Sequence, residues 1–295
     1  MTIALVQQHA GSDAAGNRRR GLAAVDRAAD LGAALVVFAE LAFDRFLPQD
    51  PATPPALALA EPIPGPTTEA FAARARARGV VIVLNLFERA GDRTFDSSPV
   101  IDADGRLLGV TRMVHITDYP CFHEQGYYAP GDRGAPVYET AVGRLGVAIC
   151  YDRHYPEYMR ALALAGAEIV VVPQAGAEDE WPDGLYEAEL QVAAFQNGYY
   201  TALCNRVGEE SRLRFAGESF VCDPAGRVVA RAGRGTDEIL LCEVDRDGVG
   251  RSHARRLFLR DRRPELYGEW LGRRRERGGG GGRAPDAGPR PGEES

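Results

Sequence analysis

Short apolar runs alternate with helical segments along most of this chain, and this alternation constrains the fold more than any other feature of the sequence. Apolar runs of strand length beside segments of helical periodicity are typical of βαβ units, in which helices cover a mostly parallel sheet. Buried strands are expected at residues 2–7, 35–38, 80–86, 145–149, 169–172 and 238–244. Hairpins are expected at residues 95–111 and 220–230, where turn residues separate two apolar runs. The chain is therefore predicted to be an α/β protein.

The predicted helices between these strands carry start signals. Ser12 and Asp13 are candidate N-caps of the first helix. Pro66 and Pro156 suit the first turns of two further helices, because a helix leaves its first N–H groups unpaired in any case. A fourth helix is expected at residues 187–195.

Two segments of the chain resemble each other. Residues 31–40 and 165–174 both read as a helix end, a glycine and a buried strand. Two such rounds indicate a pseudo-symmetric α/β architecture. The alternative is that any two junctions between a helix and a strand look alike.

The C-terminal segment has a different composition from the rest. From Arg273 onward the chain contains no apolar residue larger than alanine, so it cannot contribute to a core. We expect one domain at residues 1–277 and a disordered Gly/Pro-rich tail at residues 278–295. The arginine cluster before the tail is either a solvated segment or a contact for anionic partners.

Composition excludes several classes of protein. No stretch reaches the ~20 apolar residues of a membrane span, and the first residues lack the basic segment and cleavage site of a signal peptide. The formal charge of −7 argues against nucleic acid as a partner. Five scattered cysteines argue against a disulfide framework and favour a reducing, cytoplasmic location.

Cys150 is the first candidate for chemistry. It ends the predicted strand at residues 145–149 and precedes Arg153 and His154 and a helix start. Ligands of α/β sheets bind beyond the carboxyl ends of strands, and a thiol beside cationic groups and a helix N-terminus forms a thiolate more readily. The alternative is a small buried side chain in the core, since free cysteines are commonly buried.

Two glutamates are candidate general bases. Glu40 leaves a buried strand just as Cys150 does, and partial burial would raise its pKa toward neutrality. Glu124 lies in an aromatic loop at residues 121–132. Either carboxylate is alternatively a solvated loop residue.

Metal and cofactor motifs are absent from the sequence. His115 and His123 show no ligand spacing with the cysteines, and the chain lacks CxxC and HExxH motifs. It also lacks a phosphate-binding glycine motif. No metal and no cofactor is therefore expected.

Taken together, these positions resemble the carbon–nitrogen hydrolase, or nitrilase, superfamily over about residues 2 to 270. Residues 35–40 resemble the family's strand that ends in a general-base glutamate, and residues 146–152 with 156–157 resemble its nucleophile strand. Residues 127–132 resemble the segment after the family's second glutamate, which assigns that residue to Glu124. Later segments with similar counterparts are residues 197–198, 205–208 and 223–226. Residues 260–267 resemble the aliphatic amidase and N-carbamoyl-amine amidohydrolase branches.

The resemblance implies a four-layer α-β-β-α sandwich, usually paired into homodimers or higher homo-oligomers. It implies hydrolysis of a non-peptide C–N bond in a small linear amide or N-carbamoyl amine, while the charge and the lack of an apolar span already predict neither nucleic acid nor membrane as partner. Cys150 would be the nucleophile, Glu40 the base and Glu124 the second glutamate. The backbone N–H of Tyr151 and a lysine would stabilise the oxyanion.

The lysine is missing, because its position in the resemblance is occupied by Met113 and all 35 basic residues of the chain are arginines. Methionine has neither a donor nor a charge, and the loss of one oxyanion donor costs about 10²–10³ in turnover. Arg112, His115 and Arg153 are the nearest candidates to replace it or to bind substrate.

Three functions fit the sequence with this change. The first is a hydrolase that works through a cysteine thioester, with another group covering the loss. The second is a silent or weak relative that binds a small amide or carboxylate compound, or a partner in an oligomer. The third is an acyl transferase that passes the thioester to an amine.

Overall fold

The computed structural model describes residues 1–272. Residues 1–260 form one compact unit, and the second unit begins at Asp261. The second unit contains the helix α7 (Pro264–Leu271), whose first turn begins with a proline. The predicted tail at residues 278–295 lies outside the described residues.

One sheet of the compact unit contains seven strands in the order β15-β1-β2-β3-β5-β4, with β6 paired to β5. Strands β1, β2 and β3 run parallel, whereas β15, β4, β5 and β6 pair antiparallel with their neighbours. The strands are β1 (Thr2–Gln7), β2 (Ala33–Phe38), β3 (Val81–Val83), β4 (Leu86–Ala90), β5 (Arg93–Ile101), β6 (Leu107–Arg112) and β15 (Glu238–Glu243).

The other large sheet has six strands in the order β14-β13-β10-β9-β8-β7, and its strands β8, β9 and β10 run parallel. The strands are β7 (Val137–Thr140), β8 (Gly143–Val147), β9 (Ile169–Gln174), β10 (Tyr200–Asn205), β13 (Phe220–Cys222) and β14 (Val228–Arg231). The two segments that align in the sequence contain β2 and β9, and each is the middle strand of a parallel trio. The predicted pseudo-symmetry is thus present in the fold.

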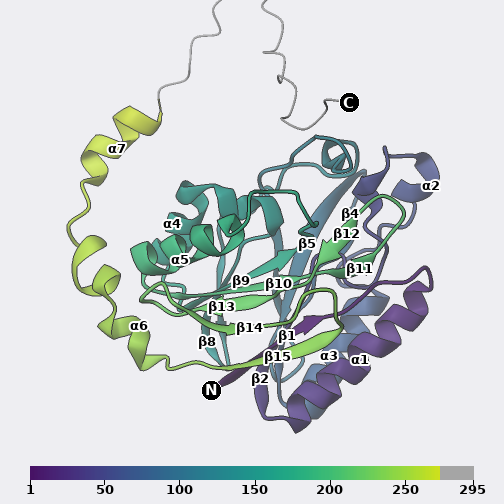
Figure 1. Cartoon of the computed structure of the whole chain (residues 1–295), viewed down its shortest axis with the longest axis horizontal. Helices are drawn as coiled ribbons and strands as arrows, with labels where there is room; N and C mark the ends of the chain where they lie inside the picture. The colour runs from purple at the N-terminus through teal and green to yellow at the C-terminus, as the bar shows by residue number, and fades with distance from the viewer. Residues whose placement is uncertain (273–295) are drawn as a thin grey trace, which may run out of the picture. The chain divides into compact units, whose positions relative to one another are not determined.

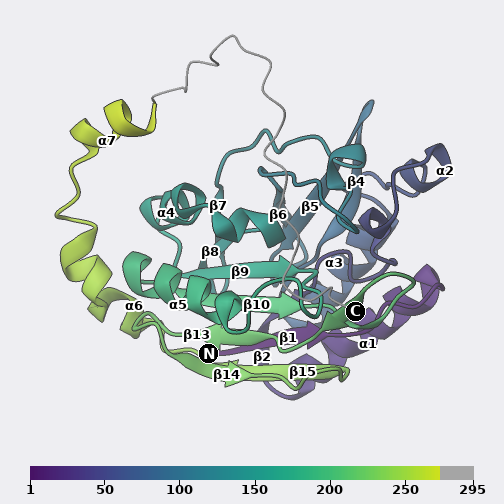
Figure 2. The same ribbon diagram turned by 45° about the horizontal axis from the view of Figure 1, so that its top comes forward.

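The two sheets pack face to face, and a pair of helices covers the outer face of each (Figures 1 and 2). The helices are α1 (Ala14–Asp30) and α3 (Pro66–Arg78) on the first sheet, and α4 (Pro156–Leu164) and α5 (Leu185–Asn197) on the second. This arrangement confirms the predicted α-β-β-α sandwich.

Alternation along the strands explains the layers. In β1, Ile3 and Leu5 belong to the core between the sheets, whereas Ala4 and Val6 pack in the core under α1 and α3. Successive side chains of a strand point to opposite faces, so a strand buried on both faces is apolar throughout. A third core lies between the second sheet and α4 and α5.

The prediction of one strand at residues 80–86 was wrong, because β3 ends at Val83 and β4 starts at Leu86. The buried side chain of Asn85 lies at the break. Its Oδ1 accepts a hydrogen bond from the Leu41 N–H at 2.8 Å, and its Nδ2 donates to Ser98 Oγ at 3.2 Å.

The remaining elements are short connections between the layers. Among the described helices, none is long and apolar enough to cross a membrane. The remaining short elements are β11 (Val207–Glu209), β12 (Arg214–Ala216), α2 (Pro54–Leu57), α6 (Asp247–Arg251), the 3₁₀ turns Leu47–Gln49, Glu124–Gly126 and Cys150–His154, and the π-helical turn Ala254–Phe258.

Candidate active site

Cys150 begins the 3₁₀ turn that follows β8, and its backbone has φ +43°. L-residues rarely adopt this left-handed region, and such strain is found preferentially at functional sites. Gln174, the last residue of β9, donates a hydrogen bond from Nε2 to the Cys150 sulfur at 3.2 Å. The Arg153 guanidinium donates to the Cys150 carbonyl at 3.1 Å and to Gln174 Oε1 at 3.0 Å. The turn therefore holds the thiol in one position.

Glu40 lies beyond the end of β2, and the next residue, Leu41, has φ +44°. Arg206 stabilises this bend by donating hydrogen bonds to the carbonyl oxygens of Glu40 and Asp44, each at 2.9 Å. Asn85 fixes the Leu41 N–H from the other side. The two strand ends that carry Glu40 and Cys150 therefore share a left-handed bend.

Glu124 begins the 3₁₀ turn Glu124–Gly126. Its Oε2 accepts a hydrogen bond from the Thr117 N–H at 3.3 Å. The N–H groups of Tyr127 and Tyr128 donate to its backbone carbonyl at 2.8 Å, so the turn is closed on itself.

The structure brings these three side chains together. One carboxylate oxygen of Glu40, one of Glu124 and the Cys150 sulfur lie within 4.8 Å of one another. Glu40 and Glu124 are fully buried, and Cys150 is 5% exposed. The Glu40 carboxylate is hydrogen-bonded to the Asp96 carboxyl group and to the Cys150 thiol, whereas Oε1 of Glu124 has no hydrogen-bond partner in the structure.

Burial dominates the electrostatics of the cluster. It raises the pKa of Glu40 to about 7, with a further contribution from the nearby Glu124 carboxylate. Burial also raises the pKa of the Cys150 thiol, and both glutamates add to this effect while Arg153 opposes it. The thiol is therefore protonated at neutral pH, and the Glu40 carboxylate is its hydrogen-bond partner.

Met113 immediately follows β6, is fully buried and packs in the same core cluster as Cys150. The register of β5 and β6 pairs Ser97 with Arg112, and the Met113 N–H donates to the Asp96 carbonyl at 2.9 Å. Met113 and Asp96 are therefore neighbours across the two strands. An apolar side chain thus lies where the resemblance expects a lysine.

The three candidate surrogates differ in what they contact. Arg112 forms ion pairs with Glu88 and, at 2.9 Å, with Asp132. His115 Nδ1 lies 2.7 Å from Asp152 Oδ1, and its ring stacks on Tyr155 with 3.5 Å between centroids. None of these contacts involves Glu40, Glu124 or Cys150.

Arg153 is the candidate that contacts the nucleophile turn: its guanidinium donates to the Cys150 carbonyl, and its positive charge tends to lower the pKa of the thiol. Tyr151 follows Cys150 in the same turn.

The sequence profile of the carbon–nitrogen hydrolases matches residues 2–254. This chain belongs to the carbon–nitrogen hydrolase family. An N-carbamoylputrescine amidase of Solanum lycopersicum is 37% identical over 222 residues, which cover 70% of this chain and 74% of that protein.

Solved structures of hydrolases share the fold. A carbon–nitrogen hydrolase of Helicobacter pylori G27 superposes with a TM-score of 0.86 at 31% identity, over 92% of this chain and 98% of that one. A variant of the amidase of Nesterenkonia sp. AN1 superposes with a TM-score of 0.77 at 27% identity, over 92% and 97% of the chains. In that variant the acetamide moiety of fluoroacetamide is added covalently to the active-site cysteine. By family, the present chain is an enzyme that hydrolyses carbon–nitrogen bonds through a cysteine.

Sequence reasoning missed a third buried carboxyl group of the hydrolase site, that of Asp96 on β5. It is fully buried, Asn85 Nδ2 donates to its Oδ1 at 2.5 Å, and its carboxyl group is hydrogen-bonded to the Glu40 carboxylate. Burial and the adjacent Glu40 raise the pKa of Asp96 well above its usual value. Asp96 lies inside a predicted hairpin and belongs to no motif, so only the strand register reveals it.

Glu180 was also missed, and it forms a wall beside the hydrolase site. Its carboxylate accepts hydrogen bonds from the hydroxyls of Tyr119 and Tyr186, each at 2.6 Å. It also contributes to the raised pKa of Cys150. The ring of Tyr186 lies under the Arg153 guanidinium at 4.5 Å, so this wall is connected to the nucleophile turn.

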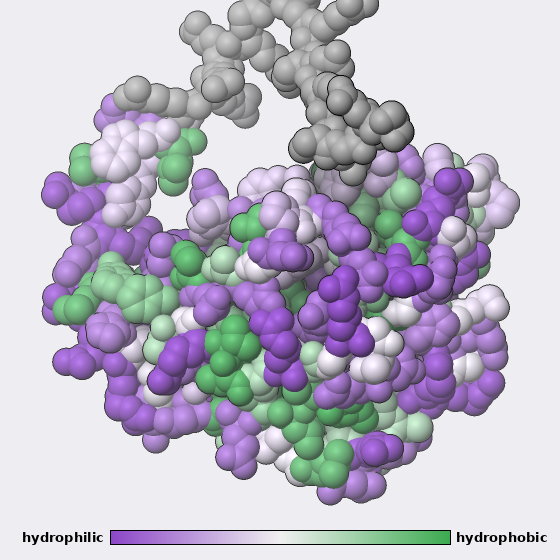
Figure 3. Space-filling model, in the orientation of Figure 1, coloured by the Kyte–Doolittle hydropathy of each residue, from purple (hydrophilic) through white to green (hydrophobic). Residues whose placement is uncertain are grey.

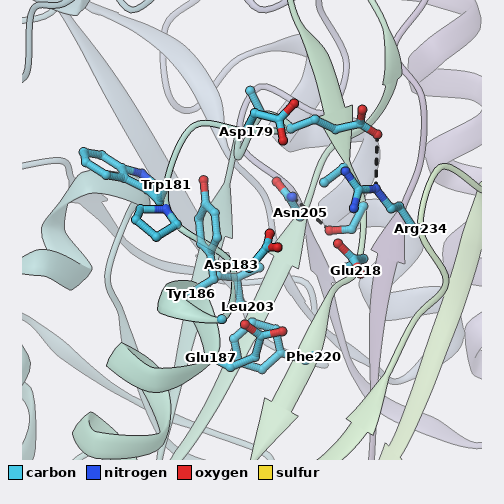
Figure 4. A pocket seen from close by; sticks show the side chains of 16 residues that line it. Asp179, Trp181, Asp183, Tyr186, Glu187, Leu203, Asn205, Glu218, Phe220 and Arg234 are labelled. Atoms are coloured by element: carbon cyan, nitrogen blue, oxygen red, sulfur yellow. Dashed lines mark hydrogen bonds and ion pairs between the residues drawn. The ribbon is translucent and has the colours of Figure 1, made fainter. Parts of the chain in front are cut away.

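Tyr186 also lines a cavity of about 320 Å³ (Figure 4). Acidic side chains, including Asp179, Asp183 and Glu218, line it together with Trp181. None of the residues of the catalytic cluster lines this cavity, so it is distinct from the site around Cys150.

We expect Asp96→Asn to flatten the dependence of stability on pH. The raised pKa means that folded Asp96 keeps a proton that the unfolded chain releases above about pH 4, so this group makes the wild type lose stability as pH rises. Asparagine has no proton to release, which removes up to about 1.4 kcal/mol per pH unit from the slope. Urea unfolding at pH 5, 6, 7 and 8 measures the effect. Asp104→Asn, in an exposed turn, is the control, and equal slopes for wild type and Asp96→Asn would contradict the expectation.

Proposed function

We propose that this hydrolase cleaves small linear amides or N-carbamoyl amines, with Cys150 as nucleophile, Glu40 as general base and Glu124 as the second carboxylate. The observation that carries the proposal is the convergence of these three buried side chains within 4.8 Å from three distant segments. The named relative, an N-carbamoylputrescine amidase, supports the carbamoyl substrate class.

The reaction follows from the positions of the groups. Glu40 takes the proton of the Cys150 thiol as the sulfur attacks the amide carbon, and the C=O π electrons move onto oxygen. The backbone N–H of Tyr151 supports this oxyanion. When the oxyanion collapses, the C–N bond breaks and Glu40 returns the proton to the leaving ammonia or amine. Water, deprotonated by Glu40, then cleaves the thioester and regenerates the thiol.

The acidic surroundings of Cys150 determine which substrates fit. The carboxylate oxygens of Glu40 and the unpaired Oε1 of Glu124 are acceptors, to which N–H groups of a carbamoyl or primary amide can donate. A substrate with a carboxylate at the reacting end would be repelled by the same oxygens. N–H-rich, uncharged reacting groups are therefore preferred.

We further propose that the enzyme is a cytoplasmic homodimer or higher homo-oligomer. Exposed apolar side chains on the outer helices, Val192 and Phe195 on α5 and Leu164 on α4, support a homodimer or higher homo-oligomer. Figure 3 shows apolar patches on one face of an otherwise hydrophilic surface. The free cysteines support a reducing, cytoplasmic location.

The test is intact-mass spectrometry after incubation with fluoroacetamide, followed by assays of ammonia release from short amides and N-carbamoyl amines. One adduct on Cys150 and its absence in Cys150→Ala are expected, with turnover lost in the same variant. Substrate binding without adduct or ammonia release would instead favour the second function, a catalytically silent relative that only binds its ligand. The buried Met113 at the position of the lysine is the observation that favours this second function. Transfer of the acyl group to an added amine would identify the acyltransferase.

The activity should rise with pH around neutrality. The pKa of Glu40 is raised from 4.5 to about 7, and the base must be ionised to accept the thiol proton. We expect kcat/KM to increase about tenfold per pH unit below pH 7 and to level off above it. A profile already flat at pH 5 would contradict the assignment of Glu40 as the base.

A further inference from the structure

We propose that Gln174 is a further catalytic residue of the hydrolase site, whose side-chain amide stabilises the Cys150 thiolate that forms when Glu40 takes the thiol proton. Arg153 is then the positioning residue that orients this amide. The inference rests on the proposed function for the roles of Cys150 and Glu40, and it adds a donor that the resemblance does not assign.

Gln174 reaches the sulfur from the strand beside that of the nucleophile. It is the last residue of β9, which pairs in parallel with β8, and Cys150 begins the turn that follows β8. Its Nε2 donates a hydrogen bond to the Cys150 sulfur at 3.2 Å. Gln174 is fully buried, and a hydrogen bond in a buried site is electrostatically stronger than one in water.

Arg153 determines which end of the Gln174 amide faces the sulfur. Arginine can only donate hydrogen bonds, and Nη1 of Arg153 lies 3.0 Å from Oε1 of Gln174. The two ends of an amide have nearly the same shape but opposite hydrogen-bonding roles, so the network of partners fixes its orientation. With the amide inverted, two donors would face each other at this contact. The NH₂ group is therefore directed at Cys150.

Arg153 is itself held in place by its surroundings. Its side chain is 1% exposed, and its Nε forms an ion pair with Glu189 of α5 at 3.2 Å. Its Nη1 also donates to the Cys150 carbonyl at 3.1 Å, and its plane packs on the ring of Tyr186. A positive charge bonded to the amide oxygen of Gln174 polarises the amide and makes its N–H a stronger donor.

The pseudo-symmetry of the fold gives Gln174 a counterpart. The aligned segments 31–40 and 165–174 end in Glu40 and Gln174, respectively. Both residues contact the same sulfur: the Glu40 carboxylate is hydrogen-bonded to the Cys150 thiol, and Gln174 donates to its sulfur. A carboxylate and its neutral amide analogue therefore meet at the nucleophile, the first as acceptor and the second as donor.

The donor acts where negative charge develops. When Glu40 accepts the thiol proton, the S–H bond breaks and its electron pair stays on sulfur. The Gln174 N–H bond to this thiolate is charge-assisted and stronger than its bond to the neutral thiol, so it favours ionisation. It opposes burial and the two glutamates, which raise the pKa of the Cys150 thiol. The charge passes to the substrate oxygen on attack and returns to sulfur when the C–S bond of the thioester breaks, so both half-reactions benefit.

The experiment measures how fast iodoacetamide alkylates Cys150 in the full chain as a function of pH, with the modified peptide identified by mass spectrometry. The thiolate displaces iodide from a saturated carbon in this reaction, so neither an oxyanion nor hydrolysis is involved. The readout therefore reports the thiolate even in a chain that hydrolyses no amide. Failure of the proposed function would be seen separately, as absence of ammonia release.

Gln174→Met keeps the length of the side chain and removes the donor. We expect alkylation at neutral pH to slow about 3–10-fold and its rise with pH to move upward by about one unit, since a higher thiol pKa lowers the thiolate fraction and intrinsic nucleophilicity recovers part of the loss. Gln191→Met is the matched control, because Nε2 of Gln191 donates to the Gly226 carbonyl at 2.8 Å, outside the site. It should react like the wild type.

Gln174→Glu separates a donor from a structural anchor. A carboxylate of the same length keeps its contact with Arg153, which also keeps it ionised, but it presents an oxygen to the sulfur. Alkylation slower than in Gln174→Met is expected. Because Gln174→Glu retains the partner of Arg153, it gives the answer even where Gln174→Met folds poorly. Reaction at the wild-type rate in either variant would overturn the catalytic role.

Arg153→Lys tests the positioning role. An ammonium cannot bond the Cys150 carbonyl, the Gln174 oxygen and Glu189 together, so the variant should show slower alkylation and the same upward move of the pH profile. In the Gln174→Met background it should add little, since both residues act through one N–H. Full additivity of the two changes would overturn the assignment of Arg153 as the residue that orients Gln174.

Discussion

The Met113→Lys variant is expected to hydrolyse short amides and N-carbamoyl amines about 10²–10³ times faster than the wild type, the range that one oxyanion donor is worth. Met113 is buried in the core cluster that contains Cys150, so a lysine stem of similar length would follow the same path. The carboxyl groups of Glu40 and Glu124, the latter with its Oε1 unpaired, can receive the ammonium, which would otherwise lose its proton on burial.

The gain should come with a change in pH dependence. An ammonium beside Glu40 favours the ionised carboxylate and so lowers its pKa. The rise in kcat/KM should therefore occur at a lower pH than in the wild type, where the pKa of Glu40 is about 7. Met113→Leu, which fills the same space without a charge, should give neither effect. Equal activity of the lysine and leucine variants, with the fold intact, would show that the pocket no longer directs a cation at the substrate.

Position along the strands explains why Cys150 and Glu40 could be found from the sequence. Each follows an apolar run, and the carboxyl ends of parallel strands are where α/β proteins place ligands. The structure adds that both strand ends bend through a left-handed residue, Cys150 with φ +43° and Leu41 with φ +44°. The sequence does not indicate these bends, because neither Cys150 nor Leu41 is a glycine. Glu124, by contrast, lies in a loop without periodicity, and only the resemblance assigned it as the second glutamate.

The rest of the site depends on long-range pairing. Asp96 and Met113 become neighbours only through the register of β5 and β6. Gln174 and Cys150 meet because β8 and β9 are adjacent parallel strands. A single sequence indicates where strands lie but not how they pair, so the buried Asp96 beside Met113 could not be predicted. Only the structure shows that Met113, the position that the resemblance assigns to a lysine, lies next to a buried acid.

Arg206 should be the most sensitive structural residue of the site. Its side chain is 2% exposed and forms an ion pair with Glu210, whose own side chain is 3% exposed. The same guanidinium holds the carbonyls of Glu40 and Asp44, and its positive charge also tends to lower the pKa of Glu40. Removing it leaves a buried carboxylate without its countercharge and releases the bend that carries Glu40.

We therefore expect Arg206→Ala to reduce the free energy of unfolding by about 3–5 kcal/mol, the range for breaking a buried ion pair from one side. Arg227→Ala is the matched control, because Arg227 is 76% exposed and such pairs contribute about 0–1 kcal/mol. Urea unfolding of both variants gives the comparison. Arg206→Lys should restore only part of the loss, since an ammonium lacks the planar fork that reaches Glu210 and the carbonyls at once. If Arg206→Ala were no less stable than Arg227→Ala, the bend at Glu40 would have to be held by Asn85 and the surrounding core alone.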